Sequence, residues 1–153
     1  MGKTKLLESA ASLPKVEEKY SEEYTVKLQE LVTIMNTKME NRDDILAMVG
    51  KSNLHMMKDN HSNHARFMES IFYNFDAETL VDTVLWVFRA YIARDFSSTY
   101  WSAQLNTWIE LYKEKLSPEC FNAIYPYYNW MQINIPVFTI LAEENIDKGK
   151  SIH

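Results

Sequence analysis

Two histidines, His61 and His64, interrupt an apolar stripe in the segment 54–75. Residues spaced three and four positions apart share one face of an α-helix. On that spacing the face reads Leu54, Met57, His61, His64, Met68, Ile71 and Phe75. Imidazoles donate and accept hydrogen bonds and titrate near neutral pH. The pattern indicates either a polar chamber that meets a ligand or two structural histidines hydrogen-bonded within the core.

Histidines also bind metal ions and haem, and the sequence around His61 and His64 bears on both. His55 and Asp59 lie close by, but a zinc site needs three or four converging ligands, and no H-E-x-x-H pattern is present. A globin-type haem needs a histidine on the helix that follows, and the segment 77–94 contains no His, Cys or Met. We therefore predict no metal and no resident cofactor, and we keep a haem-binding gas or redox sensor as the alternative.

Arg89 and Asp82 are charged residues within an otherwise apolar stretch, and their seven-residue spacing places them on one helix face. One interpretation is a solvated strip or an ion pair with a neighbour. The other is that Arg89 supplies positive charge to a bound anion, because an unpaired charge in a low-dielectric chamber is very costly.

The aromatic and methionine content, 13% aromatic residues and 8 Met, indicates either a packed core or a long apolar tunnel. Methionine adapts its shape and suits a flexible, chain-like ligand. Catalytic signatures such as G-x-S-x-G, a glycine-rich phosphate loop and C-x-x-C do not occur. The single cysteine, Cys120, is typical of a small packing residue. We therefore predict that the chain is not an enzyme.

The overall composition fits one domain of 153 residues with a substantial core. A net charge of −5 without a basic stripe disfavours nucleic acid as a partner. A single cysteine permits no intramolecular disulfide, which is typical of the cytoplasm. No apolar run approaches the roughly 20 residues of a membrane span.

Helical periodicity dominates the chain. We expect helices over about 4–11, 15–39, 41–48, 53–75, 77–94, from 97 or 98 onward, and 118–144, with 1–14 as an N-terminal extension and 145–153 as a loose tail. The segment 77–94 is apolar on most sides, so we expect it in the middle of the structure. Pro126 and Pro136 should bend or break the last helix. This pattern favours an all-α, globin-like packing over a regular four-helix bundle.

Several runs carry a resemblance to a known family: MMKDNHSNHARF (56–67), VDTVLWVFR (81–89), YW (100–101) with LNTW (105–108), and IYPYYNWM (124–131). Together they resemble the non-haem globin sensor domains of bacilli. Those are stand-alone sporulation-inhibitory proteins, similar to the sensor domain of a sporulation histidine kinase. The resemblance covers residues 20–144.

This resemblance implies a globin fold without haem, a homodimer, a fatty acid in a hydrophobic tunnel and a halide such as chloride in an adjoining polar chamber. It also implies that the free domain inhibits sporulation by competing with a related sensor histidine kinase for signal or partner. The family's ligand residues are not carried over, so our site residues come from the stripe. We assign the anion to His64, Arg89 and His61. We assign the acyl chain to Met57, Phe67, Met68, Ile71, Leu85, Phe88, Trp108, Tyr128 and Met131. A pure interaction protein with a filled core is a further alternative.

Overall fold

The computed structural model describes the backbone of residues 2–152 and the side chains of residues 2–144. The described residues form α1 (Gly2–Ala11), α2 (Glu18–Glu40), α3 (Ile45–Val49), α4 (Leu54–Tyr73), α5 (Ala77–Ile92), α6 (Ser98–Lys115), α7 (Pro118–Ile133) and α8 (Ile135–Ile152), with a 3-10 turn at Lys51–Asn53. No strand occurs among them. The all-α class is therefore confirmed. No described helix is long and apolar enough to cross a membrane.

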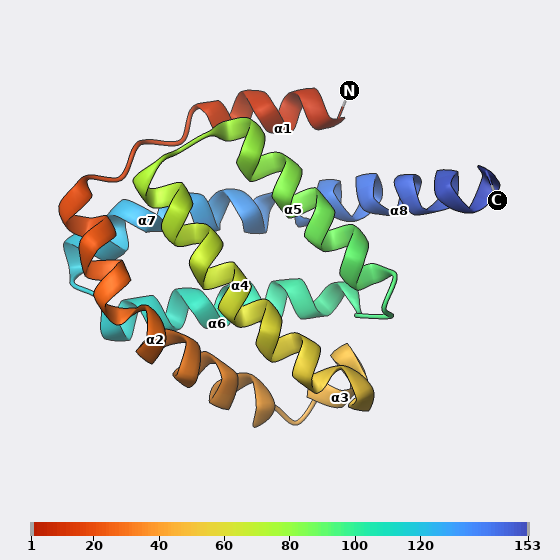
Figure 1. Cartoon of the computed structure of the whole chain (residues 1–153), viewed down its shortest axis with the longest axis horizontal. Coiled ribbons are helices and arrows are strands. Elements are labelled where there is room, and N and C mark those ends of the chain that lie inside the picture. The colour runs from red at the N-terminus through yellow and green to blue at the C-terminus, as the bar shows by residue number, and fades with distance from the viewer. Residues whose placement is uncertain (1, 153) are drawn as a thin grey trace.

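The helices are arranged so that α4 and α5 lie on the near face of Figure 1, with α6 and α7 crossing behind them. Helix α2 packs against α4 and α6, whereas α5 packs against α1 and α8. Helix α6 also packs against α7. The hydrophobic core lies between these layers.

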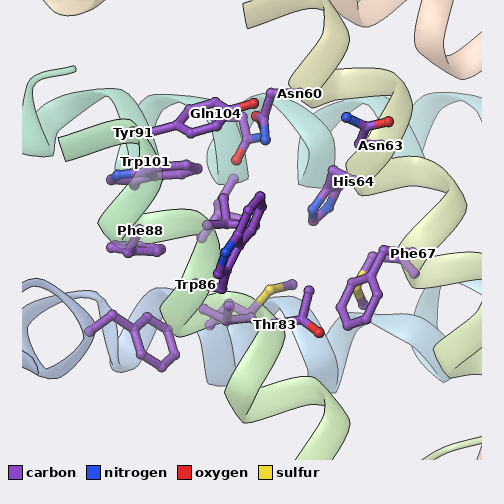
Figure 2. Close-up of a pocket in the computed structure, with 16 residues that line it drawn as sticks. Asn60, Asn63, His64, Phe67, Thr83, Trp86, Phe88, Tyr91, Trp101 and Gln104 are labelled. Carbon is purple, nitrogen blue, oxygen red and sulfur yellow. Dashed lines mark hydrogen bonds between the residues drawn. The ribbon is translucent and has the colours of Figure 1, made fainter. Parts of the chain in front are cut away.

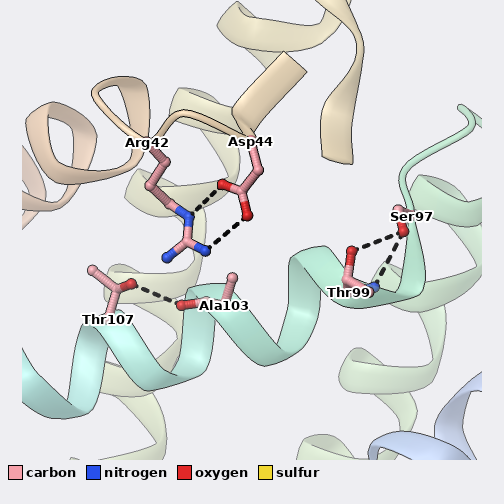
Figure 3. A network of polar contacts seen from close by, with 6 residues as sticks. All are labelled: Arg42, Asp44, Ser97, Thr99, Ala103 and Thr107. Atoms are coloured by element: carbon pink, nitrogen blue, oxygen red, sulfur yellow. Dashed lines mark hydrogen bonds and ion pairs between the residues drawn. The ribbon is translucent and has the colours of Figure 1, made fainter. Parts of the chain in front are cut away.

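Three of the described helices begin at a side chain that caps the first turn. The side chains of Asp76, Ser97 and Ser117 accept hydrogen bonds from backbone N–H groups in the first turns of α5, α6 and α7, and these helices begin close to the starts expected at 77, 97 or 98, and 118. The helix expected over 41–48 begins later, because Asn41 ends α2 and α3 begins at Ile45. The guanidinium of Arg42 donates to both Asp44 oxygens, at 2.9 and 3.1 Å, and this contact orders the connection before α3 (Figure 3).

The helix expected over 118–144 is divided in two beside Pro136, but it is not broken at Pro126. Pro126 lies inside α7, which is continuous to Ile133. A proline removes the hydrogen bond to the carbonyl four residues earlier. That carbonyl belongs to Asn122, an exposed residue that water can reach. The break comes instead at Asn134, and Pro136 follows in the first turn of α8, where its missing N–H costs nothing.

Both chain ends differ from our expectations. The segment 1–14, expected as an extension, contributes Leu6 and Ala10 to the core, with 2% and 0% of their surfaces exposed. The Trp130 indole donates to the Ser9 hydroxyl at 2.8 Å, and the Tyr127 hydroxyl donates to the Pro14 carbonyl at 2.7 Å. At the other end, α8 continues to Ile152 through the expected loose tail, because no proline follows Pro136.

The position of α5 is the largest difference between expectation and structure. The sequence predicts a central helix, but α5 lies at the surface, and the Trp86 side chain is 61% exposed. One face of α5 packs against α1 and α8. Another face, which carries Val84, Val87 and Phe88, borders a cavity, whereas a central helix would border a neighbouring helix there. The apolar residues on most sides of this helix predicted that it is buried among other helices. Some of them instead form part of the wall of a cavity.

Candidate functional site

A cavity of about 270 Å³ lies between α4 and α5 (Figure 2). His64, Phe67 and Met68 line it from α4, and Val84, Val87 and Phe88 line it from α5. Its remaining wall comes from α6, α7 and α8, through Trp101, Leu105, Met131 and Phe138. The lining is therefore mostly apolar and aromatic, which is typical of sites for small organic ligands.

The mouth of the cavity is framed by side chains from the two near helices. Figure 2 shows His64 and Phe67 of α4 on one side and Thr83 and Trp86 of α5 on the other. Trp86 and Asn63 are exposed, whereas Phe67 and Thr83 are half-buried. The cavity thus opens to solvent between α4 and α5, and an aromatic side chain borders its entrance.

One end of the cavity is polar. Asn60, only 4% exposed, accepts two hydrogen bonds at Oδ1, from the Tyr100 hydroxyl and from Gln104 Nε2, both at 2.9 Å. Tyr91 lies at the same end, and burial raises the pKa of its hydroxyl above the usual value. Asn60, Tyr91 and Gln104 all line the cavity. An otherwise apolar cavity therefore ends in a group of neutral hydrogen-bonding side chains.

His64 lies between this polar end and the mouth. Its Nε2 is hydrogen-bonded to the Tyr128 hydroxyl at 2.7 Å, and Tyr128 shares a second hydrogen bond of 2.5 Å with the Tyr112 hydroxyl. Its ring also stacks on Trp108, with 5.5 Å between ring centroids. Burial lowers the pKa of His64 to about 4, so the ring is neutral at pH 7.

His61 lies in the core and does not line the cavity. The ring is fully buried, and Nδ1 lies 2.6 Å from the Asn36 side-chain oxygen. That oxygen only accepts, so Nδ1 carries the proton. Nε2 is then an acceptor, and among the described residues it has no partner. Burial, and secondarily His64, lower the pKa of His61 to about 3. The two alternatives from the sequence, a ligand-binding chamber and structural histidines, therefore apply to different residues. His64 lines a cavity, as the first requires, and His61 does not.

The contact between His64 and Tyr128 yields a testable prediction. The substitution Tyr128→Phe keeps the ring but leaves His64 Nε2 and the Tyr112 hydroxyl without this partner. Unsatisfied buried groups cost about 1–3 kcal/mol, so we expect the free energy of unfolding to fall by that amount in urea titrations. The control is Tyr125→Phe, at a ring that is 38% exposed, where we expect a change within about 0.5 kcal/mol. Equal stability of the two variants would contradict the role assigned to Tyr128.

Arg89 does not join His64. It lines a separate pocket with Lys3, Asp82, Leu85 and Leu141, in which Lys3 Nζ lies 2.8 Å from an Asp82 oxygen. Residues 82, 85 and 89 share one face of α5, whereas 84, 87, 88 and 91 face the cavity, because successive residues are rotated by about 100° around a helix. Our assignment of one anion chamber to His61, His64 and Arg89 is therefore not what the structure shows.

The residues assigned to the acyl chain fall into two groups. Phe67, Met68, Phe88 and Met131 line the cavity. The others are buried core residues outside its lining: Met57, Ile71, Leu85, Trp108 and Tyr128.

Sequence reasoning missed the polar end of the cavity. The available signal was spacing, because Asn60 lies one turn before His64, and Gln104 lies one turn after Tyr100. Two amides buried on facing helices are unusual enough to mark a site.

Comparisons with protein-family models, with curated proteins and with solved structures found no match for this chain. The family resemblance therefore rests on the sequence runs alone, and the globin-like arrangement stays a prediction. Among the described residues, no three His, Cys, Asp or Glu side chains gather closely enough to hold a metal ion. The cavity between α4 and α5 is the candidate site.

Proposed function

We propose that this chain is a non-enzymatic, ligand-binding sensor domain that holds an acyl-chain compound, such as a fatty acid, in the cavity between α4 and α5. The observation that carries the proposal is the cavity itself, with its apolar wall and its single polar end at Asn60 and Gln104. An extended amphiphile matches this arrangement, because its chain would contact Phe67, Val84 and Met131 while its head reaches the amides.

The size of the cavity limits the chain that it can enclose. The cavity has a volume of about 270 Å³ and opens to solvent at its mouth. The proposal therefore concerns a medium-length chain, or the part of a longer chain that remains inside the mouth near Trp86.

The signalling part of the proposal rests on the family resemblance. In it, the chain inhibits sporulation by competing with a related sensor histidine kinase for signal or partner. The homodimer implied by the resemblance and the cytoplasmic location inferred from the single cysteine stay predictions. The halide is left out, because Arg89 does not reach the cavity and, among the described residues that line it, none is a lysine or an arginine.

The two alternatives are less well supported. A filled core would suit a pure interaction protein, and the cavity argues against it. A haem held by a histidine needs a free imidazole nitrogen as axial ligand. His64 is the imidazole in the cavity lining, and its Nε2 is already hydrogen-bonded to Tyr128.

A series of straight-chain primary alcohols tests the proposal by isothermal titration calorimetry. Each buried methylene contributes about 0.8 kcal/mol, so we expect affinity to rise about fourfold per carbon until the cavity is full and then to level off. Parallel denaturing extraction and mass spectrometry of protein purified without detergent should recover an acyl-chain compound. If no alcohol of the series binds and no such compound is extracted, the proposal fails.

A further inference from the structure

The hydrogen-bonding pattern at the polar end determines which ligand atoms it can receive. Asn60 Oδ1 already accepts from Tyr100 and Gln104, so this oxygen and Gln104 Nε2 are engaged. An amide nitrogen has two N–H donors and a phenol has one O–H donor. Among the described residues, the Asn60 amide nitrogen and the Tyr91 hydroxyl are left as donors, and Gln104 Oε1 is left as an acceptor. The polar end therefore offers neutral donors and one acceptor to a ligand.

The cavity also lacks a counter-charge. Among the described residues that line it, none is Lys, Arg, Asp or Glu. The described charges that act on its polar end are Asp59 and Arg94, of opposite sign, which shift the pKa of Tyr91 in opposite directions. His64 is neutral, because burial holds its pKa at about 4. An ionised head would be desolvated here without a partner, which is very costly.

We infer that the cavity selects a ligand whose polar end is uncharged and both donates and accepts a hydrogen bond, and that it discriminates against an ionised carboxylate. A hydroxyl, whether of an alcohol or of an undissociated acid, and a primary amide have this chemistry. Such a head accepts from the Asn60 N–H and donates to Gln104 Oε1. A carboxylate only accepts, so it would face the Gln104 oxygen with repulsion. This inference rests on the function proposed above.

Three nine-carbon probes test it: 1-nonanol, nonanamide and nonanoic acid, each titrated into the whole chain by calorimetry between pH 6 and pH 8. A carboxylic acid in water has a pKa of about 4–5, so its neutral fraction falls about tenfold per pH unit in this range. We expect the apparent affinity for nonanoic acid to fall about 100-fold between pH 6 and pH 8. The affinities for 1-nonanol and nonanamide should change less than about twofold.

The outcomes separate this inference from the proposed function. Nonanoic acid binding as tightly at pH 8 as at pH 6, or more tightly at pH 8 than 1-nonanol, overturns the inference and leaves the proposed function intact. Binding of none of the three probes at any pH overturns the proposed function as well.

A variant locates the head group. Gln104→Leu removes the acceptor, while Tyr100 still donates to Asn60. We expect the variant to bind 1-nonanol and nonanamide with about fivefold lower affinity, which is the effect of losing one hydrogen bond. The matched control is Gln29→Leu, at an exposed position of α2, which should leave both affinities unchanged. Equal affinities in the two variants would remove Gln104 from the site.

Discussion

Lowering the pH from 7 to 5 is expected to reduce the free energy of unfolding of this chain by about 4 kcal/mol through His61 and His64 alone. Burial lowers the pKa of His61 to about 3 and that of His64 to about 4, whereas both rings titrate near 6.5 in the unfolded chain. The unfolded state therefore binds more protons at pH 5. The stabilisation is complete above pH 6.5 and is lost as the pH falls towards the folded values.

Urea titrations between pH 5 and pH 8 measure this dependence. Below pH 6.5, each histidine adds about 1.4 kcal/mol per pH unit to the slope of the free energy of unfolding against pH. His61→Gln and His64→Gln should therefore each reduce this slope at pH 5.5 by about that amount, which corresponds to one proton. His55→Gln is the matched control, because the His55 side chain is 89% exposed and the slope should not change. If the double variant His61→Gln, His64→Gln shows the same slope of unfolding free energy against pH as the natural sequence, the fold holds neither ring neutral.

Filling the cavity is expected to abolish ligand binding without unfolding the protein. Val84 lines the cavity from α5 and is only 9% exposed, so the indole of a Val84→Trp variant would enter the empty volume. If it displaces four methylenes of a bound nine-carbon chain, the loss is about 3 kcal/mol, or more than 100-fold in affinity. Calorimetry with 1-nonanol measures the loss.

The control for this variant is Val26→Trp, which adds the same side chain at a residue of α2 that is 81% exposed. It should bind 1-nonanol as the natural sequence does. Urea titration of both variants reports whether the fold persists. A folded Val84→Trp protein with unchanged affinity would place the binding site outside the cavity between α4 and α5.

The sequence predicted those features that depend on local chemistry. The caps at Asp76, Ser97 and Ser117 follow from side chains that accept hydrogen bonds within their own first turn. The stripe with His61 and His64 follows from helical periodicity, which places both on the inner face of α4. Such features need no knowledge of distant segments.

Features that depend on distant segments were not predictable in the same way. Whether α5 is central or exposed depends on how α1 and α8 cover it. The position of α1 is held by contacts of Ser9 and Pro14 with α7, more than 100 residues along the chain. The separation of Arg89 from His64 is a consequence of the same packing, because it fixes the rotation of α5 about its own axis.

Trp86 belongs to two surfaces at once, since it lines the cavity and is 61% exposed on the outside of the protein. Most buried cavities are separated from the exterior by at least one layer of side chains, so their contents can be communicated only by moving a helix. Here a molecule inside would touch an indole that a partner protein could also touch. The exterior would therefore report occupancy of the interior through an exposed side chain of the cavity wall, while the backbone stays in place.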